Sequence, residues 1–320
     1  MVAGEASAPL RPARAPRRRV DGVLLLDKPV GVSSNVALQR AKRLYAAEKA
    51  GHTGTLDPLA TGLLPLCFGE ATKFAQALLD APKAYVATVH FGVATSTGDA
   101  EGKVVRTADA AFSRADLDAA LGRFVGAIRQ VPPAYSALKF EGRAHYEYAR
   151  KGIDVPRAAR SVEIATIEVD AWSPPQAVIR VACSKGTYVR VLAEDIAGAL
   201  GTCGHLVALR RTRTGPFTID GAVTLDALEA MEMKARDARL LPPDAPLSLL
   251  ARLDVDLATE EALRAGRAGR SPPDASGRYR CYGPRDRFVG LVEASAGALR
   301  PVRLARTDTA SDAARLALEF

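Results

Sequence analysis

The sequence is poor in the residues that build disulfide frameworks, metal centres and membrane spans. Its four cysteines lie far apart without a C-x-x-C pair, and its four histidines never fall at H-x-x-x-H spacing. We therefore expect neither a disulfide framework nor a metal site, and a reducing cytoplasm fits best. No apolar run approaches the roughly 18 residues that a membrane-spanning helix needs. We expect no membrane partner.

Recognition motifs for common cofactors are also missing. The patterns G-x-G-x-x-G, G-x-x-x-x-G-K-[ST] and G-x-S-x-G do not occur. Dinucleotide-binding, P-loop and hydrolase-elbow interpretations therefore lack support. A carboxylate can act as a covalent nucleophile without any cofactor, so we expect none.

Length and charge set broad limits. At 320 residues the chain exceeds the size at which one core usually suffices, so two domains are expected. Hydrophobic residues at 48% and charged residues at 25% are typical of a soluble globular protein. The net charge of +8 suggests a polyanionic partner, but residues 1–19 contribute about half of it with five arginines against one acid. Net charge alone is weak evidence for nucleic acid.

The two ends of the chain differ from its middle. Residues 1–20 are rich in alanine, proline and arginine, which predicts a disordered basic arm. Residues 231–250 hold several prolines and polar residues and are interpreted as a linker. The remaining residues read as short strands and turns, which predicts a small, mostly β domain.

The beginning of the middle region shows clear strand and helix patterns. Residues 22–26 form a short apolar run typical of a buried strand. Ser33, Ser34 and Asn35 then offer N-caps for a helix that reaches about Tyr45.

Two further strands follow. Residues 63–68 are apolar but contain Pro65, which predicts a position near a sheet edge or bulge. Residues 83–91 alternate with a period of two. One face of that strand should carry Tyr85, Ala87, Val89 and Phe91.

The stretch Gly51–Gly62 (GHTGTLDPLATG) draws attention because it combines glycines, a histidine and a carboxylate between apolar neighbours. Asp57 followed by Pro58 is a strong helix-start pattern, so Asp57 could be a structural N-cap. A carboxylate in a glycine-rich loop could equally be held for chemistry. The stretch alone leaves both interpretations open.

Aromatic and basic residues interleave most densely between Arg129 and Arg160. Such a mixture suits RNA, because aromatic faces stack on unpaired bases and cations meet phosphates. An amphipathic helix around Tyr146–Tyr148 with a charged outer face is the alternative. The residues concerned are Tyr135, Lys139, Phe140, Arg143, His145, Tyr146, Tyr148, Arg150, Lys151, Arg157 and Arg160.

Five motifs together resemble the TruB family of tRNA pseudouridine synthases. They appear in the family's order over roughly residues 21–245, and several are long and nearly ungapped. The motifs are Gly22–Pro29 (GVLLLDKP) with Gly31, Gly51–Gly62, Tyr135–Lys139 (YSALK), Cys183–Arg190 (CSKGTYVR) and Leu209–Arg211 (LRR).

The resemblance implies an α+β fold: a mixed, largely antiparallel sheet flanked by helices, followed by a small β-rich, PUA-like domain. The catalytic domain would span residues 21–240, with an RNA-clamping insertion over residues 129–160 that closes on the T arm. Residues 250–320 would form the PUA-like RNA-binding domain. The implied reaction converts the T-loop uridine of tRNA to pseudouridine, without metal or cofactor, in a cytoplasmic monomer that needs no protein partner.

The resemblance also assigns site residues. Asp57 would be the nucleophile or charge stabiliser, Arg190 would pair with it, and Tyr85 would lie against the target base. Lys28 would support the loop. The implied catalytic residues are Asp57, Tyr85 and Arg190; the substrate-binding residues are His52, Tyr85, Tyr188 and Leu209; the supporting residues are Lys28, Gly51 and Gly54.

There are two alternatives, one a related enzyme and one of a different class. A guide-RNA-dependent synthase of the H/ACA type would depend on a larger accessory domain, and the compact tail argues against it. A non-catalytic tRNA-binding or tRNA-folding protein could use the same scaffold. Loss of Asp57, Tyr85 or Arg190 would favour that interpretation, and all three are present.

Overall fold

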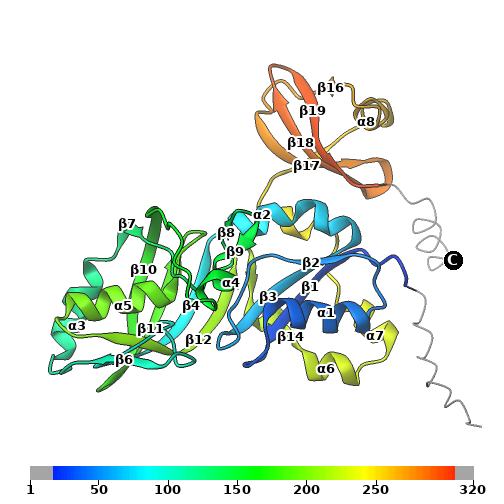
Figure 1. Ribbon diagram of the computed structural model, residues 1–320. Coiled ribbons are helices and arrows are strands. Elements are labelled where there is room, and N and C mark those ends of the chain that lie inside the picture. Colours follow the sequence, from blue (N-terminus) through cyan, green and yellow to red (C-terminus); the bar gives the residue numbers. More distant parts are fainter. Residues whose placement is uncertain (1–16, 307–320) are drawn as a thin grey trace, which may run out of the picture.

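A ten-stranded sheet forms the body of the protein (Figure 1). The computed structural model describes residues 17–306. Across the sheet the strands are ordered β14 (Val223–Thr224), β1 (Gly22–Lys28), β3 (Thr61–Phe68), β12 (Gly204–Thr214), β4 (Lys83–Phe91), β11 (Gln176–Cys183), β10 (Arg160–Ser173) and β7 (Gly126–Gln130), with β13 (Phe217–Thr218) paired to β12 and β2 (Ala50–His52) to β3. Only the pairs β1–β14 and β3–β12 are parallel. The predicted α+β class with a mixed, largely antiparallel sheet is confirmed.

Helices and short hairpins surround this sheet. Figure 1 shows α3 and α5 over the half that holds β10 and β11, and α1 and α6 beside β1 and β14. The helices are α1 (Ser34–Leu44), α2 (Ala75–Asp80), α3 (Arg114–Gly122), α4 (His145–Ala149), α5 (Val189–Ala199), α6 (Leu225–Ala230) and α7 (Met233–Asp237), with 3₁₀ turns η1 (Gly69–Phe74), η2 (Ile219–Gly221) and η3 (Ala245–Leu247). The hairpins are β5 (Val93–Thr95) with β6 (Val104–Thr107), and β8 (Lys139–Phe140) with β9 (Arg143–Ala144).

The alternation of β4 explains its place in the middle of the sheet. Tyr85, Ala87, Val89 and Phe91 are buried in the main core, as predicted, and the residues between them are partly exposed. Helices α1, α3, α5 and α6 contribute side chains to the same core. Strand β1 is buried on both faces, since Leu24 and Leu26 join the main core while Val23 and Leu25 join a second core with η1.

The prediction that Pro65 marks a sheet edge or bulge is wrong. Strand β3 lies between β1 and β12, and Pro65 stands opposite Leu25 of β1. Proline is tolerated there because β12 pairs only with Thr61 and Gly62, and β2 pairs only from Leu66 onward. The missing N–H therefore falls in the gap between two partners.

Two predicted boundaries also need correction. Residues 17–20 belong to the ordered fold rather than to a disordered arm: Arg18 forms a β-bridge with Ala47, and its Nη1 lies 2.8 Å from Asp237 Oδ2. The predicted linker of residues 231–250 includes the helix α7, and Arg236 donates to the carbonyl of Leu44 at 2.9 Å. The arm's first sixteen residues lie outside the described residues.

A second, smaller sheet forms the C-terminal domain, as predicted. Its strand order is β15 (Arg252–Asp254), β17 (Gly277–Gly283), β18 (Arg287–Ser295), β19 (Ala298–Leu304) and β16 (Gly269–Arg270), with helix α8 (Leu257–Arg264) and the turn η4 (Pro284–Asp286). The buried Glu260 carboxylate pairs with Arg264 and Arg287, each at 2.7 Å, which satisfies its charge. Residues 307–320 of the predicted domain lie outside the described residues.

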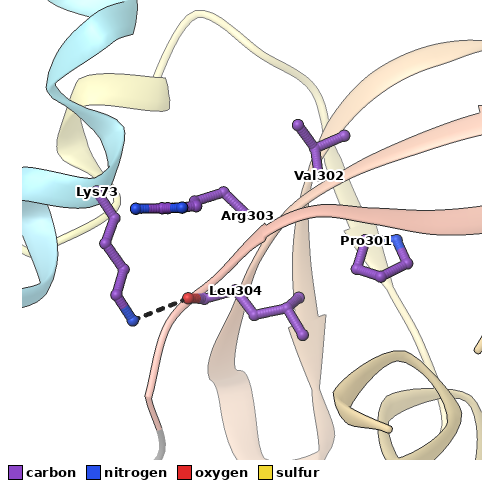
Figure 2. Close-up of a pocket in the computed structure, with 5 residues that line it drawn as sticks. All are labelled: Lys73, Pro301, Val302, Arg303 and Leu304. Carbon is purple, nitrogen blue, oxygen red and sulfur yellow. Dashed lines mark hydrogen bonds between the residues drawn. The ribbon is translucent and has the colours of Figure 1, made fainter. Parts of the chain in front are cut away.

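The two domains meet at η1. Phe74 packs with Leu247 and Ala305 in a small apolar cluster, and its ring lies 5.3 Å from that of Phe288. Beside this contact Lys73 donates to the carbonyl of Leu304 at 3.1 Å, across a hollow of about 390 Å³ (Figure 2). Apolar packing and hydrogen bonds therefore both join the domains.

Candidate active site

Asp57 lies in the loop between β2 and β3, and both of its neighbours are anchored. The buried hydroxyl of Ser34, at the start of α1, accepts from the N–H of Leu56 at 2.7 Å and donates to its carbonyl at 3.0 Å. The carbonyl of Pro58 accepts from the N–H of Gly31 at 2.8 Å and from Lys28 Nζ at 3.4 Å. These bonds fix the loop on either side of the carboxylate.

The N-cap interpretation of Asp57 is wrong. Residues 55–60 contain no helix, and the only turn bond of Asp57 joins its carbonyl to the N–H of Ala60 at 3.1 Å. A helix would direct the Pro58 carbonyl to Gly62, but that carbonyl is already bonded to Gly31 and Lys28. The side chain of Asp57 is therefore not used for capping.

Arg190 joins Asp57 to the rest of the site. It is the second residue of α5, and its Nη2 lies 2.9 Å from Asp57 Oδ2. The Arg190 side chain is 6% exposed, whereas that of Asp57 is 40% exposed. Arg190 also donates to the carbonyls of Thr97 at 2.8 Å and Tyr135 at 2.7 Å. A buried, multiply bonded guanidinium thus holds a carboxylate that remains open to solvent.

Asp99 is a site residue that the sequence reasoning missed. Its buried carboxylate lies 3.6 Å from Arg190 Nε. Asp99 Oδ1 accepts from the Thr97 hydroxyl at 2.5 Å and from the N–H of Glu101 at 3.1 Å. The only signal in the sequence was a carboxylate inside the Gly- and Thr-rich stretch of residues 95–102.

The charges of the site act on one another. Burial raises the pKa of Asp57 and Asp99 adds to this effect, while Arg190 opposes it. Burial lowers the pKa of Lys28 to about 8, and the Asp57 carboxylate opposes that shift. Lys28 is completely buried and donates to the carbonyls of Pro29 and Val32, which agrees with the implied supporting position.

Tyr85 stands opposite Arg211 on the neighbouring strands β4 and β12. Arg211, only 1% exposed, donates to the carbonyls of Leu63 at 2.7 Å and Gly54 at 3.2 Å. Burial raises the pKa of Tyr85, and the charge of Arg211 opposes this shift. Arg211 therefore supports both the loop and the strand of Tyr85. Arg211 lies in the motif Leu209–Arg211, but the sequence does not show that it bonds to the loop at Gly54.

The backbone explains why glycine stands at some positions of the loop and not at others. Gly62 has φ +99°, and a Cβ there would lie 2.3 Å from the carbonyl oxygen of Arg211. Gly54 has φ +123°, a conformation that side chains disfavour. Gly51 has neither a positive φ nor a close neighbour. The local backbone thus explains glycine at two of these positions and not at Gly51.

His52 ends β2, and its ring faces the buried charge of Arg211. Burial and that charge lower the pKa of His52, and its Nδ1 is buried without a hydrogen-bond partner. The ring is therefore neutral near pH 7. Leu209 lies in β12 opposite Ala87 of β4 and is 8% exposed.

Tyr188 precedes α5 by one residue, and the guanidinium of Arg160 lies 4.7 Å from its ring centroid. The structure therefore brings Asp57 and Arg190 into direct contact. Tyr85, Lys28, Leu209 and Tyr188 lie on the strands and helix that border them.

The stretch of residues 129–160 contacts Arg190 and the residues directly before α5. It forms the end of β7, the hairpin β8–β9 and the predicted helix near Tyr146, here the five-residue α4. The carbonyl of Tyr135 accepts from Arg190, so the stretch is connected to the candidate catalytic pair. Tyr146 is partly exposed with Arg150 above its ring at 5.3 Å. Contact with RNA remains a prediction.

Within residues 17–306, no group of three or more His, Cys, Asp or Glu side chains is placed to hold a metal ion. All four cysteines are buried and unpaired. No helix of the described chain is long and apolar enough to cross a membrane.

Comparison with known families gives the class of protein. The family model described as "TruB family pseudouridylate synthase (N terminal domain)" matches residues 42–189, and the one described as "tRNA pseudouridylate synthase B C-terminal domain" matches residues 190–248. The two matches meet inside α5 and together cover residues 42–248. The line between them is not a boundary between structural domains.

Relatives named tRNA pseudouridine synthase B match almost the whole chain. That of Burkholderia mallei (strain ATCC 23344) is 56% identical over 301 residues, covering 92% of this chain and 97% of the relative. That of Ralstonia pickettii (strain 12J) is 54% identical over 311 residues, covering 92% and 97%. That of Cupriavidus metallidurans is 52% identical over 310 residues, covering 94% and 99%.

Solved structures agree on the fold. The chain is similar to one in the crystal structure of a Cbf5-Nop10-Gar1 complex, with 26% identity, a TM-score of 0.69 and coverage of 93% of this chain and 91% of that chain. A chain of the archaeal box H/ACA sRNP Nop10-Cbf5 complex is 25% identical, with a TM-score of 0.65 and coverage of 89% of this chain and 85% of that chain. The fold and the relatives define a pseudouridine synthase. The chain belongs to the TruB family of tRNA pseudouridine synthases, enzymes that isomerise uridine to pseudouridine.

Proposed function

We propose that the substrate is the T-loop uridine of tRNA and that Asp57 is the nucleophile in its isomerisation. The relatives at 52–56% identity that carry the name tRNA pseudouridine synthase B support tRNA as the substrate. The observation that carries the role of Asp57 is its ion pair with Arg190: one partner is buried and fixed, and the other faces solvent. A carboxylate held in this way is available to a reacting atom.

The reaction is balanced without a cofactor. The bond between ribose C1′ and uracil N1 breaks, and the uracil rotates while it stays bound. C5 then bonds to C1′, the proton on C5 is lost, and N1 gains one. In the proposed reaction the Asp57 carboxylate forms a bond to the substrate, either to ribose C1′ or to the uracil ring, as the glycosidic bond breaks. That bond breaks again when C5 has bonded to C1′, and the electron pair returns to the carboxylate.

Arg190 has two effects on this step. Its charge favours the ionised form of Asp57 against burial, and its two carbonyl bonds keep the guanidinium from turning away. Tyr85 is proposed to lie against the uracil and assist the proton transfer at C5. Because burial raises the pKa of Tyr85, the phenol carries its proton before the reaction begins. Its oxygen would take the proton from C5 as its own proton passes to solvent.

A stacked base must leave its stack before this chemistry is possible, at a cost of a few kcal/mol. We propose that the flat rings of His52, Tyr85 and Tyr188 offset this cost. His52 would fill the space that the uridine vacates, and its lowered pKa supports this role because a neutral ring stacks without desolvating a charge. Leu209 would line the uracil pocket with Tyr188.

The remaining roles extend the same proposal. Residues 129–160 would close over the T arm, and the C-terminal domain (residues 250–320) would act as the PUA-like RNA-binding domain. The protein would work in the cytoplasm as a monomer, without a guide RNA or protein partner. The solved relatives include complexes of the H/ACA type, so guide dependence is the alternative to exclude.

The test is an unmodified tRNA transcript incubated with purified protein, without metal, guide RNA or partner. Pseudouridine should form in the T loop. Asp57→Asn should bind tRNA and make no product, while Asp118→Asn, on the exposed face of α3, should match wild type. Tight binding without product from wild type would favour a tRNA-folding protein. Product only after addition of a guide RNA would favour the H/ACA-type alternative.

A further inference from the structure

The first turn of α5 lacks the usual side-chain cap. Its N-cap residue is Tyr188, which makes no side-chain capping bond. The first N–H groups of a helix have no partner within the helix, so an uncapped first turn frays readily. Arg190 is the second residue of this turn. Something outside the helix must therefore hold the backbone that places Arg190 against Asp57.

Gln130 supplies that hold. It is the last residue of β7 and is 1% exposed. Its Oε1 accepts from the N–H of Tyr188 at 3.0 Å, and its Nε2 donates to the carbonyl of Tyr188 at 3.3 Å. The same carbonyl accepts the first bond within the helix, from the N–H of Leu192 at 3.0 Å. One amide side chain thus holds both polar groups of the N-cap residue.

Arg160 holds the side chain of the same tyrosine. Arg160 is the direct partner of Gln130 in the pairing of β7 with β10. Its guanidinium lies 4.7 Å from the ring centroid of Tyr188 and donates to the carbonyl of Gly186. Residues 131–159 therefore leave and rejoin the sheet at two residues that both contact Tyr188.

We propose that Gln130 is a positioning residue for the isomerisation: its amide fixes the backbone of Tyr188, and through it the turn of α5 that presents Arg190 to Asp57. This inference rests on the proposed function. Gln130 does not reach the reacting atoms, so its loss should slow the chemical step without weakening tRNA binding.

The first test replaces Gln130 by methionine, which keeps the side-chain length and removes both hydrogen bonds. Under single turnover with saturating tRNA, Gln130→Met should react at least about tenfold more slowly, with an unchanged Kd for tRNA. Gln176→Met, which removes an exposed amide, is the matched control and should react as wild type does. A wild-type rate for Gln130→Met, or an equal loss of rate and affinity, would overturn the proposal.

The second test uses Gln130→Glu and pH. A protonated carboxyl group can donate to the carbonyl of Tyr188 and accept from its N–H, as the amide does, whereas a carboxylate only accepts. The rate relative to wild type at the same pH should therefore rise as pH is lowered. Gln130→Met should show no such recovery. A relative rate of Gln130→Glu that does not change with pH would show that only side-chain volume matters, and would contradict the proposal.

A third measurement separates this inference from the proposed function. Hydrogen exchange of the amides of Tyr188, which bonds to Gln130, and of Leu192, which bonds to the Tyr188 carbonyl, needs no substrate. In Gln130→Met these two amides should exchange faster, while those of the last turn of α5 keep their wild-type rates. Unchanged exchange of the Tyr188 and Leu192 amides would overturn the role of Gln130 even if the tRNA reaction is confirmed. Wild-type protein that makes no product would overturn the proposed function alone.

Discussion

At the scale of single residues, the site depends on the unequal exposure of one ion pair. Arg190 is buried and bonded to four neighbours, so its position is fixed before RNA arrives. Asp57 receives one of those bonds and otherwise faces solvent. A carboxylate that is fixed but accessible has the properties expected of a nucleophile, and the structure explains both properties through Arg190.

The raised pKa of Asp57 predicts a pH dependence. The proposed reaction needs the carboxylate, and the protonated fraction grows as pH falls through the raised pKa. The single-turnover rate of wild type should therefore fall on acidification with a midpoint above the ordinary aspartate value of about 3.9. Rates measured across the acid range on folded protein test this. An acid limb at or below the ordinary value would contradict it.

Replacing Asp99 should change the acid side of the pH–rate profile. Asp99→Asn keeps an acceptor for Thr97 but removes a negative charge beside Arg190. We expect a rate about tenfold lower, because Arg190 loses one of its fixed partners. The acid limb should move to lower pH, because Asp99 raises the pKa of Asp57. Asp195→Asn, on the exposed side of α5, is the control and should change neither quantity.

The sequence can predict a site residue when the residues next to it in the chain carry a recognisable pattern. It cannot do so when the role depends on partners far along the chain. Asp57 and Arg190 lie in long motifs, so the resemblance could find them. Tyr85 lies outside those motifs, in the alternating strand of residues 83–91, and the resemblance assigned it there. Asp99, Arg211 and Gln130 act through contacts far along the chain: Gln130 is 58 residues from Tyr188, and Arg211 is 157 from Gly54. Nothing in the residues around them indicates these partners. Only the pairing of strands brings them together.

At the scale of elements, α1 and the Asp57 loop form one unit. Two adjacent serines at the start of α1 have different duties. Ser33 caps the helix by accepting from the N–H of Val36, whereas Ser34 bonds to both polar groups of Leu56, next to Asp57. From the sequence both serines are possible N-caps. Nothing in it shows which one caps the helix and which one bonds to Leu56.

The two serines predict a matched comparison. Ser33→Ala should lower the free energy of unfolding by about 1 kcal/mol and leave the rate unchanged. Ser34→Ala should lower it by about 1–3 kcal/mol, because the buried polar groups of Leu56 lose their partner. It should also slow the single-turnover reaction. Denaturant unfolding and rates of both variants test this; equal rates in the two variants would show that α1 does not position the loop.

The clearest patterns in the sequence predict the strand β4 and the start of the helix α1 correctly. The alternation of residues 83–91 predicted β4 and its buried face, and serine caps predicted the start of α1. The N-cap pattern of Asp57-Pro58 and the edge signal of Pro65 do not predict the structure, because tertiary bonds decide both. The Pro58 carbonyl is bonded to Gly31 and Lys28, and Pro65 falls where neither neighbouring strand needs its N–H. Local propensity yields to such contacts.

At the scale of the whole molecule, two domains are joined through η1 and the end of β19. The contact combines the apolar cluster around Phe74 with the bonds of Lys73 and of the Arg306 N–H, which donates to Glu70 at 2.6 Å. The sequence predicted the two domains and the β character of the second. It could not show that residues 231–250 pack on the first domain, because their prolines and polar residues resemble those of a linker.

The basic residues of the stretch 129–160 predict that tRNA binding depends on salt. Phosphate contacts release counterions, so tRNA affinity should fall linearly with salt concentration on a double-logarithmic plot. Lys139→Gln, an exposed residue of β8, should reduce the slope by about one. Lys234→Gln, exposed on α7, should leave it unchanged. Kd measured over a range of salt tests this, and a salt-insensitive Kd would contradict the predicted RNA contact of residues 129–160.

We propose that the half-exposed carboxylate of Asp57, held by Arg190, detaches the uracil. The most direct measurement compares wild type with Asp57→Asn on the same unmodified tRNA, recording bound tRNA and T-loop pseudouridine together. The amide has nearly the shape of the carboxylate but lacks its charge and nucleophilicity. We predict equal binding by both proteins and product from wild type alone. Pseudouridine formed by Asp57→Asn at the wild-type rate would contradict the account.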